Sequence, residues 1–312
     1  MLTTFGRVTN EAPGLPDAVV TGLAAMLGAG LLVGIGPAAS ASGAWMIAGL
    51  VLAAPIAVAC GLSTSEPMSP LGLLGRSAGA AAIAGAFGRY LVPEHPKPAA
   101  GVLVVVVTVL TYAGWAPPRL LIRAGVVVVL AVLAVFVATC FAIEPPPNAP
   151  GGSDPSGLPV ATFILVFGFL GTERKLRTRG HRITAIGVAL VIYLVVAGAA
   201  MYQLGANRLG LSPVPLRDAL AAADASGIAP VLTVGAVLAT VLALFGVLTD
   251  IDADDEPWEV AVGAAAMAAG ALLLPVPTLI VVAVALMVGD RLLRLATSRP
   301  GSARRRPRSG RS

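Results

Sequence analysis

Charged residues are scarce in this sequence. Asp, Glu, Lys and Arg together make up 12% of its 312 residues, whereas a soluble domain contains about 25%. Hydrophobic residues make up 57%. This composition excludes a water-soluble globular fold and predicts that the chain is embedded in a membrane.

Alternation of apolar and polar residues is also missing. Segments 102–110 and 125–141 are continuously apolar, whereas the strands of a transmembrane β-barrel alternate with a period of two. Aromatic residues make up only 5%, and small apolar side chains let helices pack closely in a bilayer. We therefore expect an all-α polytopic membrane protein.

Residues that carry catalysis or bind metals are few. The two cysteines, Cys60 and Cys140, lie in apolar runs without a second ligand type at zinc spacing, and we interpret both as packing residues. The sequence contains no Ser/His/Asp set, no HExxH motif and no P-loop. We expect no catalytic residue, no metal site and no enzymatic activity.

Ten apolar runs are long enough to form membrane helices, since about 20 residues span the hydrocarbon. A Pro/Gly-rich segment at 144–157 follows the fifth run and separates two sets of five. The expected helices are 18–39, 44–62, 70–92, 100–115, 120–143, 158–171, 184–204, 228–249, 258–274 and 278–296. The expected organisation is a cytoplasmic N-terminus (1–17), a first five-helix repeat (18–143), an extracytoplasmic linker (144–157), a second repeat (158–297) and a basic tail (298–312).

The distribution of Lys and Arg predicts the orientation, because cytoplasmic loops carry the excess. With the N-terminus inside, sixteen of the 21 cationic residues lie on the cytoplasmic side. We expect a multi-pass protein of the cell membrane with both termini cytoplasmic. The basic tail is expected to be disordered and attracted to anionic lipid, and no nucleic-acid partner is expected.

A short polar segment lies between the seventh and eighth predicted helices. Residues 213–226 have amphipathic character, with Asp218 and Asp224 on a polar side. This pattern predicts an interfacial helix or lid on the extracytoplasmic surface.

The first predicted helix contains a cluster of glycines, Gly28, Gly30 and Gly34. If the helix unwinds near 28–30, free amides at a half-helix N-terminus can bind a carboxylate. The alternative is close helix packing, since Gly30 and Gly34 have GxxxG spacing.

The sixth predicted helix opens the second half and is also short and interrupted by glycine, at Gly168 and Gly171. Two broken segments at matching positions of two five-helix halves are typical of a transporter site at the membrane midplane. The pair is a more specific signal than either segment.

At these two segments the chain resembles the amino acid, polyamine and organocation (APC) permease superfamily, whose members have the inverted-repeat, LeuT-type fold. The first helix is similar to the family's G-x-G-[IV]-F segment, with Leu32 in place of the aromatic residue. The sixth helix is similar to the family's F-x-F-x-G-F-E, carried here by residues 167–173 with Thr172 in place of the second aromatic. Weaker similarity extends to 84–91 and 193–197, so the resemblance covers most of a chain shortened to about ten helices.

The resemblance implies that the α-carboxylate of a substrate meets the backbone of the first helix, while its amine meets carbonyls around Phe167 and Gly168. Phe167 and Phe169 are expected to flank the site as gate or platform. The residues that the resemblance places in the substrate site are Gly28, Ala29, Gly30, Phe167, Gly168, Phe169 and Gly171.

Ionisable residues at membrane depth are candidates for gating or coupling. Glu173 is the acidic residue that the family motif retains, and Arg89 lies near the end of the third predicted helix. Arg76 and Asp290 are further candidates, but all three helix residues lie near predicted ends, where snorkelling is the alternative.

These observations predict a secondary transporter of amino acids or related organic amines that works by alternating access, without a cofactor, on an H⁺ or Na⁺ gradient. The alternative is a transport-incompetent APC-like protein that acts as an accessory or interaction partner. A continuous, closely packed first helix over 28–34 without a central cavity favours this alternative.

Overall fold

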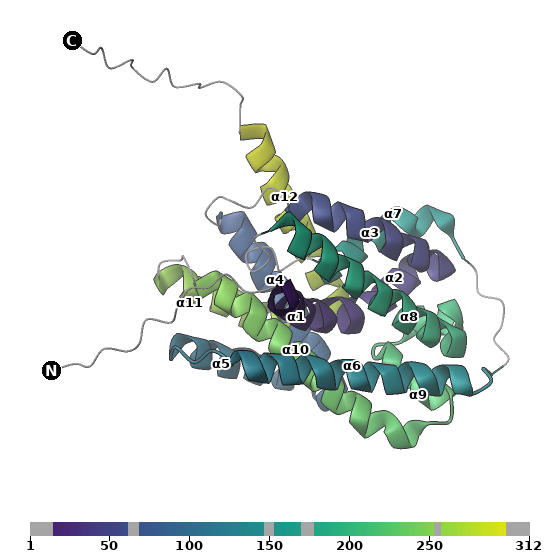
Figure 1. The fold of residues 1–312 in the computed structure, drawn as a ribbon. Coiled ribbons are helices and arrows are strands. Elements are labelled where there is room, and N and C mark those ends of the chain that lie inside the picture. Colours follow the sequence, from purple (N-terminus) through teal and green to yellow (C-terminus); the bar gives the residue numbers. More distant parts are fainter. Residues whose placement is uncertain (1–14, 62–68, 147–152, 170–177, 253–256, 298–312) are drawn as a thin grey trace, which may run out of the picture.

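The computed structural model describes residues 15–61, 69–146, 153–169, 178–252 and 257–297. Within these ranges the chain folds into helices joined by short connections, and contains no β-strand. Figure 1 shows the helices packed into one bundle, with α1 seen nearly end-on among them. The predictions for the basic tail lie outside the described residues.

The first half of the chain contains helices at the five predicted positions. In chain order they are α1 (Leu15–Met26), which continues through the π-helical turn η1 (Leu27–Leu31) into α2 (Leu32–Ser42), then the turn η2 (Gly43–Trp45), α3 (Met46–Gly61), α4 (Pro70–Leu91), α5 (Pro96–Tyr112) and α6 (Arg119–Ala142).

The second half also contains helices at its five predicted positions, together with the predicted short helix between the seventh and eighth. In chain order the elements are η3 (Pro155–Gly157), α7 (Leu158–Val166), the 3₁₀ turn η4 (Phe167–Phe169), α8 (Arg179–Leu211), α9 (Pro215–Ala222), η5 (Ser226–Ile228), α10 (Ala229–Asp252), α11 (Pro257–Leu273) and α12 (Val276–Thr297).

Six helical stretches in the described residues are long and apolar enough to cross a membrane. The first runs for 42 residues, from Val19 to Cys60, which at the rise of an α-helix is about 63 Å, or roughly two bilayer cores. The chain changes direction inside it at Gly43, whose φ of 60° lies in the left-handed region that favours glycine. This stretch is therefore long enough for two spans, and three shorter apolar helices lie at the positions of the fourth, sixth and ninth predicted spans.

The outer helices expose large apolar side chains. Val102 and Val109 on α5 are 63% and 60% exposed, and Leu120 and Val127 on α6 are 77% and 65% exposed. Such a surface is unfavourable in water and matches lipid chains. Together with the spans, it makes the chain an all-α polytopic membrane protein.

The helix α4 has the opposite character, because protein surrounds it. It contacts α5, α10, α11 and α12, and Ala80, Ala82 and Ala84 have no exposed surface. Its mean hydropathy of 1.2 is the lowest of the six long spans. A helix without lipid contact needs small residues for close approach rather than an apolar surface, and α4 is rich in Gly and Ala.

Helices at corresponding positions of the two halves pack against each other. The first, second, third and fourth spans of one half contact their counterparts in the other, as the pairs α2–α7, α3–α8, α4–α10 and α5–α11. The helices α1, α2, α3, α7 and α8 thus lie beside one another, as do α4, α5, α10 and α11, and α1 also contacts α10.

The short helix α9 follows a break in α8. The break is at Gly205, with φ 69° and ψ 160°, and the helical chain after it extends to Leu211. On α9, Leu216 and Leu220 are buried, while Asp218 is only half-buried and its carboxylate accepts a hydrogen bond from the Ser212 hydroxyl. The amphipathic helix predicted between residues 213 and 226 is therefore confirmed.

The contact between α4 and α5 can be tested at Gly88. A Cβ added there lies 2.0 Å from the carbonyl oxygen of Pro96, so Gly88→Ala forces the two backbones apart. We expect a loss of about 1–3 kcal/mol, seen as a lower melting temperature of the purified protein in detergent.

Gly198→Ala is the matched control, because a Cβ at Gly198 in α8 has no neighbour within 4 Å. It is expected to leave the melting temperature unchanged or raise it, since Ala is favoured over Gly in helices by about 1 kcal/mol. Equal effects of the two substitutions would contradict the described packing of α4 on α5.

Candidate functional site

The glycine cluster of the first span lies in the π-helical turn η1. All five of its residues, including Gly28, Ala29 and Gly30, are buried. The prediction that the helix unwinds at 28–30 is wrong, because the chain stays wound from α1 through η1 into α2. The wider turn interrupts the regular α-helical hydrogen-bonding pattern without opening the helix, so it presents no half-helix N-terminus.

The sixth span departs from α-helical geometry at Gly168, but a break of the helix stays a prediction, because residues 170–177 lie outside the described residues. Its α-helical part, α7, has nine residues and passes into the 3₁₀ turn of Phe167, Gly168 and Phe169, all buried. The predicted site residues Gly171 and Glu173 lie in the segment 170–177, outside the described residues.

The two interrupted segments touch at their glycines. A Cβ added to Gly30 lies 2.7 Å from the Cα atom of Gly168, and one added to Gly168 lies 2.6 Å from the Cα atom of Gly30. Gly28 is equally confined, since its Cβ would lie 2.2 Å from the carbonyl oxygen of Ala239 on α10. The predicted close packing is therefore present at Gly30, whereas Gly34 meets only the Leu165 side chain at an ordinary 3.7 Å.

Tyr193 on α8 joins the two segments. Its hydroxyl donates to the carbonyl of Met26, the residue before η1, and lies 3.0 Å from the carbonyl oxygen of Gly168. The side chain is buried, and an added Cβ at Gly30 would meet its hydroxyl oxygen at 2.4 Å. Tyr193 therefore fills the space beside the glycine contact and binds both interrupted segments.

The two phenylalanines lie on different sides of this contact. The Phe169 ring packs on Tyr193, with 5.1 Å between ring centroids and 41° between planes. The Phe167 ring lies against α4, where a Cβ added to Gly79 would be 2.8 Å from its Cε2 atom. Thus the structure brings six of the seven predicted substrate-site residues into one buried cluster, between α4 and α8.

Sequence reasoning did not assign a role to Tyr193. A signal was present, because a tyrosine at the centre of an apolar span must find a hydrogen-bond partner for its hydroxyl. Which carbonyls it reaches depends on the packing of α8 against α1 and η1, which no local pattern specifies.

A cavity of about 230 Å³ lies on the extracytoplasmic side of the cluster in the predicted orientation. Its walls come from the end of α2, the end of α4, the connection from α8 to α9 and the start of α12. Arg89 is the charged residue among those that line the cavity, and Ser40 and Ser212 are polar lining residues. We call it the Arg89 cavity.

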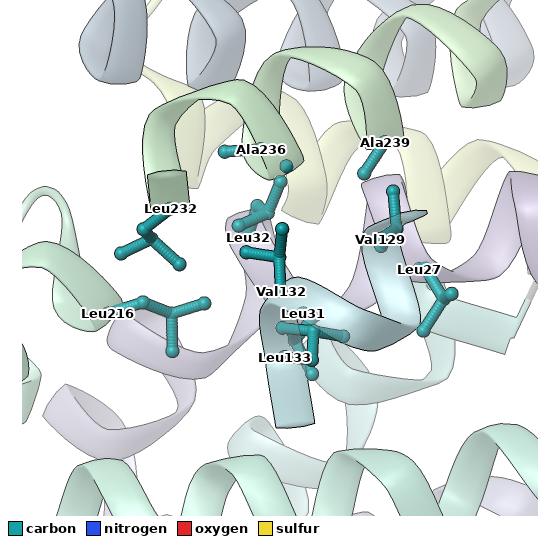
Figure 2. A pocket seen from close by; sticks show the side chains of 11 residues that line it. Leu27, Leu31, Leu32, Val129, Val132, Leu133, Leu216, Leu232, Ala236 and Ala239 are labelled. Atoms are coloured by element: carbon teal, nitrogen blue, oxygen red, sulfur yellow. The ribbon is translucent and has the colours of Figure 1, made fainter. Parts of the chain in front are cut away.

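A second, much smaller pocket lies between η1, α6, α9 and α10, and Figure 2 shows its side chains pointing toward one another. Its lining is aliphatic throughout and includes Leu27, Leu31, Val132 and Leu232. We call it the aliphatic pocket. Leu32 lines both this pocket and the Arg89 cavity, so its side chain lies between them.

The other predicted ionisable candidates lie at the opposite end of α4. Asp290 is buried, accepts a hydrogen bond from the Ser69 hydroxyl and pairs with Arg294 at 3.0 Å. Arg76 is also buried. Among the described residues no group of three or more His, Cys, Asp or Glu side chains could hold a metal ion, and Cys60 and Cys140 are free thiols.

Comparison with known proteins finds relatives named as transporters. No family model matches the chain. It is 29% identical over 286 residues to the "uncharacterized transporter Rv1999c" of Mycobacterium tuberculosis and, equally, to the "uncharacterized transporter Mb2022c" of Mycobacterium bovis. Each alignment covers 76% of this chain and 63% of the relative, so the chain spans less than two thirds of the length of these proteins.

The role of Tyr193 can be tested with Tyr193→Phe. This change leaves the carbonyls of Met26 and Gly168 without the hydroxyl, so we expect a loss of about 1–3 kcal/mol and a lower melting temperature. Tyr202→Phe is the control, because Tyr202 is 41% exposed and is expected to tolerate the change. A Tyr193→Phe protein as stable as the wild type would show that the hydroxyl does not hold the two segments.

Proposed function

We propose that the chain is a secondary transporter of amino acids or related organic amines that works by alternating access. The observation that carries the proposal is the contact between η1 and η4. These two interrupted segments begin the two halves of the chain, and they meet at Gly30 and Gly168 in the buried core. Helix interruptions at matching positions are typical of transporter sites.

The named relatives support the coarser part of this proposal. Each is called a transporter, and a transporter role agrees with a polytopic helical bundle. The amino acid substrate is inferred from the resemblance of residues 28–32 and 167–173 to the APC superfamily rather than from these relatives.

The pairing of corresponding helices supports a five-plus-five inverted repeat of the LeuT type. Under this proposal, α1, α2, α3, α7 and α8 form one group and α4, α5, α10 and α11 form the other. In alternating access, one such group moves against the other around a fixed site. The proposed site lies where both groups meet, because η1 contacts both α8 and α10.

The substrate is proposed to bind at Gly28, Ala29 and Gly30 on one side and at Phe167, Gly168, Phe169 and Gly171 on the other. In this structure Gly28 and Gly30 are already in close contact with protein atoms, so binding requires η1 and η4 to separate. The hydroxyl of Tyr193 is suited to such a step, because one hydrogen bond contributes only about 1 kcal/mol net. The structure then corresponds to a closed, substrate-free form of the site.

The remaining parts of the proposal concern energy and location. Glu173 and Arg89 are proposed as gating or coupling residues, with an H⁺ or Na⁺ gradient as the energy source. The protein is proposed to lie in the cell membrane with both termini cytoplasmic and its basic tail on anionic lipid.

A second candidate function is a transport-incompetent accessory protein. It is favoured by one specific observation: the first span stays wound through Gly28 and Gly30 and packs directly on Gly168 and Tyr193. Under this hypothesis the same glycines serve only helix packing.

Uptake of radiolabelled amino acids into proteoliposomes distinguishes the two functions. We expect gradient-dependent uptake by the wild-type protein. Gly30→Leu is expected to abolish it, because the Leu side chain needs the space of Tyr193 and Gly168. Phe167→Ala, which removes a ring without adding volume, is expected to lower uptake at least tenfold in a folded protein.

Gly187→Leu is the matched control for Gly30→Leu, because Gly187 on α8 has no neighbour within 4 Å of an added Cβ. It is expected to retain wild-type uptake. Absence of uptake for every amino acid and amine tried, by a wild-type protein with a normal melting transition, would contradict the transporter proposal and favour the accessory role.

A further inference from the structure

We infer that the Arg89 cavity binds the carboxylate of a small aliphatic substrate, whose tail packs against Leu32. The inference deepens the proposed function, and rests on it for the idea that a bound molecule is carried onward. It names a substrate class, small carboxylates with a branched aliphatic tail, and a place where they first bind.

The charge of Arg89 is the first argument. Arg89 is half-buried near the end of α4 and lines the cavity. It makes no ion pair or hydrogen bond within the described part of the chain. A partly buried guanidinium is unfavourable unless an anion compensates it, and its planar fork suits a carboxylate.

Asp218 on α9 is the acidic residue closest in sequence to a residue that lines the cavity, since it follows Pro215 by three positions. Its carboxylate accepts a hydrogen bond from Ser212, which lines the cavity. No ion pair joins Asp218 to Arg89 in the described part of the chain. The Arg89 guanidinium is therefore open to an anion that enters the cavity.

The size of the cavity is the second argument. Its volume of about 230 Å³ equals that of roughly seven or eight water molecules. This space accommodates a small organic acid. Much of the remaining lining is aliphatic or prolyl, including Val33, Pro37 and Val276, so the cavity offers one charged contact and an apolar wall, as small-molecule sites do.

The position of Leu32 is the third argument. It follows directly after η1 and lines both the Arg89 cavity and the aliphatic pocket. Figure 2 shows Leu32 among the aliphatic side chains of that pocket. The aliphatic pocket itself has only about 10 Å³ of free space, so a tail held at Arg89 ends against the Leu32 side chain.

Melting shifts of the purified full-length protein test the inference, in detergent without anionic lipid. The probes are L-leucine, 4-methylpentanoate, which has the carboxylate but no amine, and 3-methylbutylamine, which has the amine but no carboxylate. We expect the first two to raise the melting temperature of the wild type and the third to leave it unchanged. An equal shift from the amine, or no shift from either carboxylate, overturns the inference.

Variants of Arg89 test the residue itself. Arg89→Gln is expected to weaken binding of 4-methylpentanoate at least about tenfold, because the charge-assisted hydrogen bonds are lost. Arg89→Lys is expected to restore part of the affinity. Arg208→Gln is the matched control, since Arg208 is an exposed arginine near the end of α8. Wild-type affinity in Arg89→Gln overturns the inference.

A lipid phosphate is the other source of an anion for Arg89. Phosphatidylglycerol added to the detergent is therefore a separate experiment, and a melting shift from this lipid without one from either carboxylate overturns the inference.

Leu32→Phe tests the position of the tail, because the larger ring fills the space beside residue 32. It is expected to weaken 4-methylpentanoate binding while leaving acetate binding unchanged, and equal effects on both overturn the role given to Leu32.

The outcomes separate this inference from the proposed function. Uptake of amino acids without Arg89-dependent carboxylate binding rejects the inference and leaves the transporter proposal intact. Arg89-dependent binding without any uptake retains the site and rejects transport.

Discussion

Peptide groups inside a bundle in lipid have no water to bind, so every interruption of a helix needs a partner from within the protein. In this chain the partner is one hydroxyl. Tyr193 on α8 contacts the carbonyls of Met26 and Gly168, which belong to the first and sixth spans. The two interruptions can lie together because Gly30 and Gly168 have no side chains to keep their backbones apart. The buried centre of the fold depends on this arrangement.

The same arrangement explains why the centre is closed while a cavity remains beside it. The Tyr193 ring occupies the space next to Gly30, and the Phe167 and Phe169 rings fill the sides toward α4 and α8. Further along the first span, Pro37 and Ser40 face a cavity that reaches Arg89. Gly30 and Pro37 are thus about two helical turns apart along the first span, with Leu32 between the buried contact and the cavity.

Some of this organisation could be predicted from particular residues. Apolar length located the helices, and the glycines at 28, 30 and 168 indicated where the two interrupted segments lie. The third predicted helix has the lowest hydropathy of the six long helical stretches, and it is α4, which other helices surround. Low hydropathy and high Gly and Ala content therefore reflect burial in protein rather than a marginal membrane segment.

Local sequence determined the helical class and the positions of the helices, because hydrogen bonding and hydrophobicity in lipid act over a few neighbouring residues. Tertiary structure alone decided that the first interruption is a π-helical turn and not an open end, that Tyr193 serves both segments, and that Arg89 faces a cavity. Each of these depends on side chains more than 20 residues apart in the sequence. Their meeting is a property of helix packing, which the periodicity of a single helix does not encode.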